Sequence, residues 1–283
     1  MEDRLARLLG QHGLIEARFD HCVQALGDEE ITRGRSTLEE KGHVTDPKEA
    51  LAFFSSYTFP ATRQLLFPVA DGWTAALNNS KNGSDFREYQ DGWCRAVRAR
   101  TLRVVDQDPV VRKRVVLAYE ARIVELYDAS ARIVRIVTCM NDGGRWAWHV
   151  SGDPLPVEAG FPFDARKVKD RFTRSHLRTW IHSLGAPAVD AAAFLNCRSF
   201  SLVEETYKNA DWMARIRAKA CTEEELLEPA HGFYERGLTW MDNLETHATS
   251  AITDFERALE INPAYESRVR PHLDRAYRFV RGK

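Results

Sequence analysis

The segment Trp146-Ala-Trp148-His149-Val-Ser151 holds the residues best suited to acid–base chemistry. If this segment is an extended strand, His149 and Ser151 share one face and the two tryptophans share the other. Three acidic residues of the neighbouring segments are candidate partners: Glu120, Glu125 and Asp142. A histidine beside a carboxylate can act as a general base, which predicts a hydrolytic site on a sheet. The alternative is a packed aromatic ladder with a solvated opposite face.

The other short motifs do not favour a metal or cofactor site. Asn141-Asp-Gly-Gly144 could hold a phosphate or a metal ion, but a hairpin turn explains the two glycines without a ligand. The five cysteines are scattered and form no CxxC pair. Neither a glycine-rich phosphate-binding sequence nor an HExxH sequence is present. We therefore expect no metal site and no cofactor.

Six basic residues form the clearest charged cluster in the chain: Arg166, Lys167, Lys169, Arg171, Arg174 and Arg178. An acidic protein, RNA or DNA would be attracted to such a surface. A protein partner is favoured over a nucleic acid because the whole chain is almost neutral. The alternative is a solvated surface whose charges are balanced by Asp164 and Asp170.

The composition disfavours several classes of protein. The 283 residues are 44% hydrophobic, enough for a sizeable core, and the formal net charge is −1, which disfavours a globally basic nucleic-acid binder. No segment approaches the roughly 20 consecutive apolar residues that span a bilayer. The charged N-terminus Met1-Glu-Asp-Arg4 lacks an apolar secretion core, and the scattered cysteines are typical of reduced thiols. We expect a cytoplasmic protein without a membrane-spanning segment.

The elements that would position these residues are an antiparallel sheet and flanking helices. Alternating apolar residues predict about five strands, at residues 73–77, 101–105, 115–127, 131–140 and 145–150. The turns at 128–131 and 141–144 are short, so the strands that they join must be antiparallel neighbours.

Helices are predicted before, between and after the strands. They are expected near residues 15–26, 46–59, 85–97, 173–184 and 209–220. Asp46-Pro-Lys-Glu49 and Thr222-Glu-Glu-Glu225 have the pattern of capping boxes. Residues 28–45 are polar and predict a loop, whereas residues 186–208 combine helical sequence with a possible strand at 200–203.

Two sets of residues stand out near the C-terminus: Phe233, Gly237 and Trp240, followed by Ala251, Phe255, Ala258 and Pro263. Their spacing resembles the two helices of a tetratricopeptide repeat, although the turn around 243–249 is about two residues longer. One full hairpin is visible, whereas a solenoid needs three or more repeats. The resemblance implies a protein-binding surface that includes Trp240. The alternative is that these helices, with a third at 265–280, only support the sheet.

Taken together, the sequence predicts an α+β protein with a sheet domain, residues 1–208, and a helical tetratricopeptide-like region, residues 209–283. Our leading hypothesis is a non-enzymatic protein-binding module. Within that class, a bacterial immunity-type inhibitor or an adaptor fits a compact, nearly neutral chain. The alternatives are a hydrolytic enzyme that uses His149 with a carboxylate of the sheet, and a nucleic-acid-binding protein that uses residues 166–178. The sequence leaves the oligomeric state open.

Overall fold

The computed structural model describes most of the chain. The described residues are 5, 9–55, 62–79, 86–112, 115–142, 145–208 and 229–282. The predicted helix near 209–220 and the capping box at 222–225 lie outside these residues, as does Asp85 at the start of the helix predicted near 85–97.

The chain divides into two compact units. The first comprises residues 1–55, 63–108 and 119–208, and the second comprises residues 56–62, 109–118 and 209–283. The second unit therefore includes two short segments that the sequence analysis assigns to the sheet domain.

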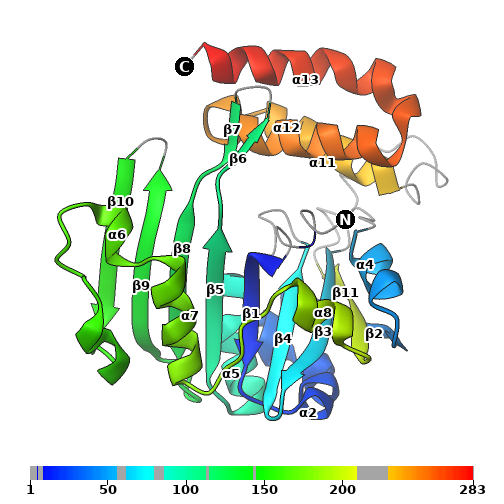
Figure 1. Ribbon diagram of the computed structural model, residues 1–283. Coiled ribbons are helices and arrows are strands. Elements are labelled where there is room, and N and C mark those ends of the chain that lie inside the picture. The colour runs from blue at the N-terminus through cyan, green and yellow to red at the C-terminus, as the bar shows by residue number, and fades with distance from the viewer. Residues whose placement is uncertain are drawn as a thin grey trace. The chain divides into compact units, whose positions relative to one another are not determined.

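The first unit is built on one large antiparallel sheet (Figure 1). Among the described residues the sheet has nine strands: β1 Gln11–Ile15, β2 Ser36–Val44, β3 Thr62–Ala70, β4 Trp73–Asn78, β5 Thr101–Gln107, β8 Ala121–Tyr127, β9 Ile133–Asp142, β10 Arg145–Gly152 and β11 Phe200–Tyr207. Their order is β10-β9-β8-β5-β1-β4-β3-β11-β2. An α+β chain with an antiparallel sheet and a C-terminal helical region is confirmed, but the prediction of about five strands is wrong.

The strands that were missed do not show uninterrupted apolar alternation. In the edge strand β2, Glu39, Glu40 and Lys41 interrupt the pattern, so the segment resembles a loop. Strand β3 contains Pro68, and its register with β4 shifts beside that residue. Strand β1 ends at Ile15, where the sequence predicts the start of a helix.

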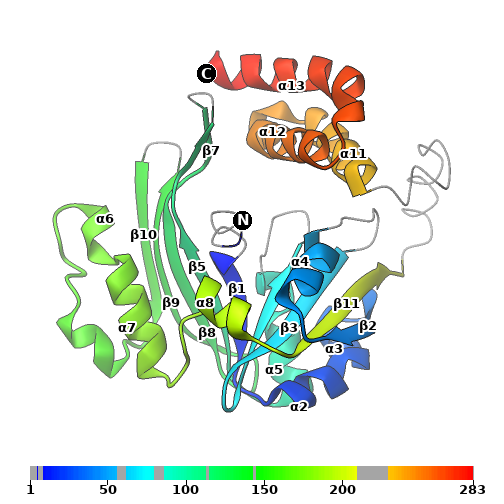
Figure 2. The same ribbon diagram turned by 45° about the vertical axis from the view of Figure 1, so that its right-hand side comes forward.

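Helices cover both faces of the sheet (Figures 1 and 2). One face carries α4 Pro47–Ser55, the 3₁₀ helix η3 Pro156–Gly160, α6 Val168–Arg171, α7 Arg174–Ser183 and α8 Ala191–Asn196. The opposite face carries α2 Phe19–Gln24, η1 Ala25–Gly27, α3 Glu29–Thr32, η2 Phe86–Glu88 and α5 Gln90–Val97. Two predicted helix starts are observed, because Asp46 accepts a hydrogen bond from the Lys48 N–H and Thr173 caps α7.

Alternation along the strands supplies apolar side chains to both layers. Leu14 packs in the layer that contains α7 and α8, whereas the adjacent Ile15 packs in the layer that contains α5. Leu65 and Leu66 divide between the two layers in the same way. Burying one such side chain completely stabilises the fold by about 1.5–3 kcal/mol, so the strands hold helices on both faces.

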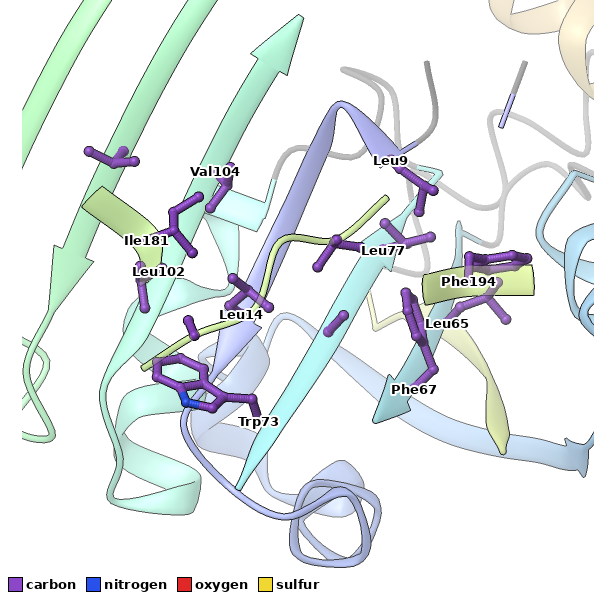
Figure 3. Close-up of a cluster of buried hydrophobic side chains, with 14 of the residues drawn as sticks. Leu9, Leu14, Leu65, Phe67, Trp73, Leu77, Leu102, Val104, Ile181 and Phe194 are labelled. Atoms are coloured by element: carbon purple, nitrogen blue, oxygen red, sulfur yellow. The ribbon is translucent and has the colours of Figure 1, made fainter. Parts of the chain in front are cut away.

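The core of the first layer lies between the sheet and helices α7 and α8 (Figure 3). Ile181 of α7 lies beside Leu102 and Val104 of β5. Phe194 of α8 meets Phe67 of β3 edge to face, with ring centroids 5.4 Å apart. These contacts fix the position of the segment between β10 and α8, which carries the basic cluster.

The second unit consists, in its described part, of three helices and a short hairpin. Its elements are β6 Val110–Arg112, β7 Val115–Ala118, α11 Pro229–Met241, α12 Leu244–Ile261, the 3₁₀ helix η4 Pro263–Tyr265 and α13 Glu266–Arg281. Helices α11 and α12 approach closely at Gly237, since a Cβ atom there would lie 2.5 Å from the ring of Phe255. Ala251 and Ala258 are fully buried. These small residues permit the close approach, while the tetratricopeptide resemblance stays a prediction.

No helix in the described ranges is both long and apolar enough to cross a membrane.

Candidate functional site

His149 lies on β10, at one edge of the sheet, and its side chain is exposed. Thr138 of β9 is opposite it, and β9 separates β10 from β8, on which Glu125 is located. Glu120 precedes β8 and lies 3.4 Å from Arg122. The structure therefore does not place either carboxylate on a strand that neighbours His149.

The other carboxylates of the predicted hydrolytic site are positioned differently. Glu125 is buried and accepts a hydrogen bond of 2.9 Å from Arg103, while Arg87 lies 3.9 Å away. Its oxygens thus serve an ion cluster between β5 and β8. Asp142 ends β9 opposite Arg145, and its side chain lies outside the described part of the structure.

Arg174, in the predicted basic cluster, is held by two aspartates. Its Nε atom lies 2.9 Å from both carboxylate oxygens of Asp106, and its Nη2 atom lies 2.9 Å from Asp108. Arg122 also contacts Asp108, at 2.7 Å. Burial acts to raise the pKa of the Asp108 carboxyl, but hydrogen bonds from the two arginines outweigh it and lower that pKa. Arg174 therefore joins α7 to the end of β5, and its side chain is still 41% exposed.

Arg171 is also partly engaged within the protein. Its Nε atom donates a hydrogen bond to the Ala165 carbonyl at 2.8 Å. Its guanidinium lies over the indole of Trp148, 5.8 Å from the ring centroid. The cation–π contact joins the end of α6 to β10, and the hydrogen bond joins it to the turn before α6.

The remaining four residues of the cluster are exposed, and within the described ranges none of them forms an ion pair: Arg166, Lys167, Lys169 and Arg178. We call these four residues the basic surface. Asp164 and Asp170 are exposed as well, and in the described part of the chain neither is within ion-pair distance of a basic residue. Among the residues that the structure describes, Asp164 and Asp170 therefore form no ion pair with the basic cluster.

A group of aromatic rings lies beside the basic surface. Trp148 of β10 and Phe163 are 5.0 Å apart, Phe161 and Phe163 are 5.8 Å apart, and Phe161 stacks on His176 of α7 at 4.8 Å. We call these four residues the aromatic cluster. All four are half-buried. Phe161-Pro-Phe163 directly precedes the basic residues, and this adjacency is the sequence signal for the aromatic cluster.

A buried ion pair anchors this region to the sheet. Arg135 of β9 and Glu158 of η3 form a two-pronged contact, in which Nε lies 3.1 Å from Oε1. Trp180 of α7 donates its Nε1–H to the same oxygen at 2.8 Å. The side chains of Arg135 and Glu158 are 5% and 2% exposed, so the contact is shielded from water. The surface beside it is consequently held on a rigid base.

His12 of β1 is the most strongly shifted histidine in the first unit. Its Nδ1 atom lies 2.7 Å from the Leu9 carbonyl, so a neutral ring donates from Nδ1 and leaves a lone pair on Nε2. Burial lowers its pKa to about 4, against the hydrogen bond to Leu9 and the charge of Asp106, which raise it. His12 is thus uncharged at neutral pH.

Trp240, the predicted binding residue of the helical unit, lies in its core. Its side chain is buried, and its Nε1–H donates to Asp254 at 2.8 Å. Arg236 forms a two-pronged ion pair with the same carboxylate, at 2.6 Å. Trp240 therefore helps to join α11 to α12 and presents no exposed ring face.

The helical unit has a groove of about 630 Å³. Its lining combines apolar side chains with charges of both signs, and includes Met241, Leu244, Glu245, Arg275 and Arg278. The groove lies where the C-terminal ends of α11 and α13 meet the N-terminal end of α12.

Two further observations bear on the chemistry. Within the described ranges, no three His, Cys, Asp or Glu side chains are grouped so as to hold a metal ion. Comparisons of the chain with protein-family models, with curated proteins and with solved structures find no match.

Proposed function

We propose that this protein is a binding protein whose basic surface holds an acidic segment of another protein. The observation that supports this proposal is the group of four exposed cations without an ion-pair partner in the described part of the chain. An immunity-type inhibitor and an adaptor would both use such a surface.

The position of the cations favours specific binding over a general attraction. Lys169 is on α6, whose Val168 carbonyl accepts a hydrogen bond from the Cys139 thiol of β9. Arg178 is on α7, whose Trp180 donates to Glu158 in the ion pair with Arg135. Charged side chains on helices that are already fixed lose less conformational entropy when a partner binds than charged side chains on a mobile segment. The half-buried Phe163 beside them can contact an apolar residue of the partner, which would add affinity that salt does not screen.

The stacking of the rings favours a protein over a single-stranded nucleic acid. Nucleic-acid surfaces of this kind use free aromatic faces on which bases stack. One face of Phe161 is taken by His176, and one face of Trp148 is taken by the guanidinium of Arg171. Two of the rings therefore have one face already covered, which leaves less room for stacked bases and favours contact with the side chains of a protein.

A binding measurement with a defined acidic probe tests the proposal. The probe is a fluorescent peptide of alternating glutamate and leucine, and the variant is Lys167→Glu/Lys169→Glu/Arg178→Glu. We expect the wild type to bind the peptide with an affinity that falls as salt is raised, and the variant to lose at least about tenfold in affinity.

A matched control separates the surface from net charge. Arg18→Glu/Lys48→Glu/Arg98→Glu makes the same change in charge at exposed positions of the first unit, none of which has an ion-pair partner within the described residues. We expect the control to bind like the wild type. Equal loss in both variants contradicts the proposal. Tighter binding of a single-stranded oligonucleotide than of the peptide would replace it with the nucleic-acid alternative.

A further inference from the structure

Three helices of the second unit border a groove of about 630 Å³. Helix α12 packs against both α11 and α13, so the three helices form one small bundle (Figures 1 and 2). The groove lies at the end of this bundle, where the turn between α11 and α12 meets the last turns of α13. Its volume is within the range of about 300–1,000 Å³ that is typical of sites for small ligands.

Arg275 and Arg278 of α13 give the groove a cationic wall. They are separated by about one turn of the helix, so their side chains are neighbours and their charges repel each other. Both side chains are exposed, and neither forms an ion pair with a residue that the structure describes. An anion held between the two guanidinium groups would relieve this repulsion.

The dipole of α13 accounts for only part of this wall. Cations in the last turn of a helix are stabilised by its terminal carbonyl groups, and Arg278 and Arg281 are in that turn. Arg275 precedes the last turn, where the effect of the dipole has fallen off. Asp274 of the same helix is exposed and forms an ion pair with neither Arg275 nor Arg278. The pair of arginines is therefore available to a ligand.

The turn between α11 and α12 supplies the other polar groups of the groove. Asp242 and Asn243 are exposed there, and the Asn243 side chain forms no cap hydrogen bond with α12. The two carboxylates of the lining, Asp242 and Glu245, form no ion pair with the two arginines. Opposite charges thus line one groove without neutralising each other. The largely buried Met241 and Leu244 add apolar surface to the same lining.

We infer that this groove binds a phosphate monoester with a hydroxylated body, such as a sugar phosphate or a nucleoside monophosphate. The phosphate lies between Arg275 and Arg278. Its dianion balances two cations and offers three free oxygens, whereas a carboxylate offers one charge and two oxygens. Hydroxyl groups of the body donate to Asp242 and exchange hydrogen bonds with Asn243. The Asp242 carboxylate disfavours a ligand that carries anions at both ends.

Calorimetric titration of the full chain tests the class of ligand. The probes are ribose 5-phosphate, adenosine monophosphate, ribose and inorganic phosphate. We expect both esters to bind with a dissociation constant on the order of 100 μM, and the other two probes to bind at least about tenfold more weakly. Tighter binding of adenosine monophosphate than of ribose 5-phosphate supports a nucleotide, and otherwise a sugar phosphate is supported. The inference is overturned if neither ester binds at concentrations on the order of 1 mM, or if inorganic phosphate binds as tightly as the esters.

Variants of the lining assign the binding to this groove. We expect Arg275→Gln/Arg278→Gln to lose at least about tenfold in affinity for ribose 5-phosphate, because charge-assisted hydrogen bonds are removed. Asp242→Ala should lower the ratio of the affinity for ribose 5-phosphate to that for inorganic phosphate, which a purely electrostatic effect would leave unchanged. The control Arg268→Gln/Arg270→Gln removes two charges from the same helix outside the groove and should bind like the wild type. Equal losses in the control and in the groove variant contradict the site. None of these measurements uses the acidic peptide or the basic surface.

Discussion

His12 shows how one buried side chain can set the response of a whole fold to pH. Its ring is buried in the layer between β1 and the helices, and its Nδ1 atom is fixed by the Leu9 carbonyl. A proton on Nε2 would place a positive charge in this layer. The fold excludes that proton until the pH is far below neutral, since the pKa is lowered to about 4.

Acidification should therefore weaken the fold through this residue. Between pH 6.5 and pH 4 the unfolded chain binds a proton at His12 that the folded chain does not, so the free energy of unfolding falls as the pH falls. The full effect is about 3 kcal/mol. We expect His12→Asn, which keeps a donor for the Leu9 carbonyl, to lose less stability than the wild type between pH 7 and pH 4.5 in urea titrations. Parallel losses in the two proteins would assign the acid sensitivity to other groups.

The ion pair of Arg135 and Glu158 is the second feature whose effect can be measured residue by residue. Arg135→Met leaves the Glu158 carboxylate buried without its cation, and we expect a loss of about 3–5 kcal/mol in the free energy of unfolding. The double variant Arg135→Met/Glu158→Leu removes both charges and should lose less than the single variant. A larger loss in the double variant would show that the pair stabilises the fold beyond its burial cost.

At the scale of elements, the sequence predicts what local rules determine. Helices α4 and α7 begin where Asp46 and Thr173 cap them, and β8, β9 and β10 follow each other through short turns. Strand β2 is held by its pairing with β11, more than 150 residues later in the chain, and no local pattern reveals that. Tertiary pairing overrode local propensity there.

The candidate site also has one part that the sequence predicts and one part that only the fold assembles. The basic residues are adjacent in the chain, so the sequence predicts them as a group. The aromatic cluster requires β10 to bring Trp148 to Phe163, and that contact arises only in the fold. The predicted set around His149 does not assemble because β9 lies between β10 and β8, an order that the two short turns already predict.

The contact between α11 and α12 gives an element-scale prediction. Replacing glycine by alanine inside a helix normally stabilises it by about 1 kcal/mol. At Gly237 the new Cβ atom would meet the ring of Phe255, so we expect Gly237→Ala to destabilise the protein by about 1–3 kcal/mol. Gly27→Ala, where nothing lies within 4 Å, is the control for chemical denaturation. A stabilised Gly237→Ala variant would show that the helices can separate without cost.

At the scale of the whole molecule, the chain passes between the two units after residues 55, 62, 108, 118 and 208. The hairpin of β6 and β7 interrupts the connection from β5 to β8 and packs beside α12 within the second unit. Because Gln107 and Ala121 are directly paired, a loop of about five residues, which remains when Asn-Gly replaces residues 109–118, could join β5 to β8 without that hairpin.

Truncation after Lys208 should therefore have two outcomes that depend on the hairpin. A chain that keeps residues 109–118 leaves β7 without α12, and we expect it to self-associate on size-exclusion chromatography. A chain in which Asn-Gly replaces these residues should elute without large aggregates and keep a cooperative unfolding transition. Identical behaviour of the two truncated chains would show that the hairpin does not need the helices.

The order of these segments also has a consequence during translation. The hairpin leaves the ribosome well before α12, because roughly 130 residues separate them, and synthesis proceeds at about 5–20 residues per second. On the order of ten seconds therefore pass between the synthesis of β7 and the synthesis of α12, the helix beside which it packs. The sheet can form while the chain is still growing, but the second unit closes only after the last helices have emerged. Chaperones that protect nascent chains would meet this protein at its hairpin.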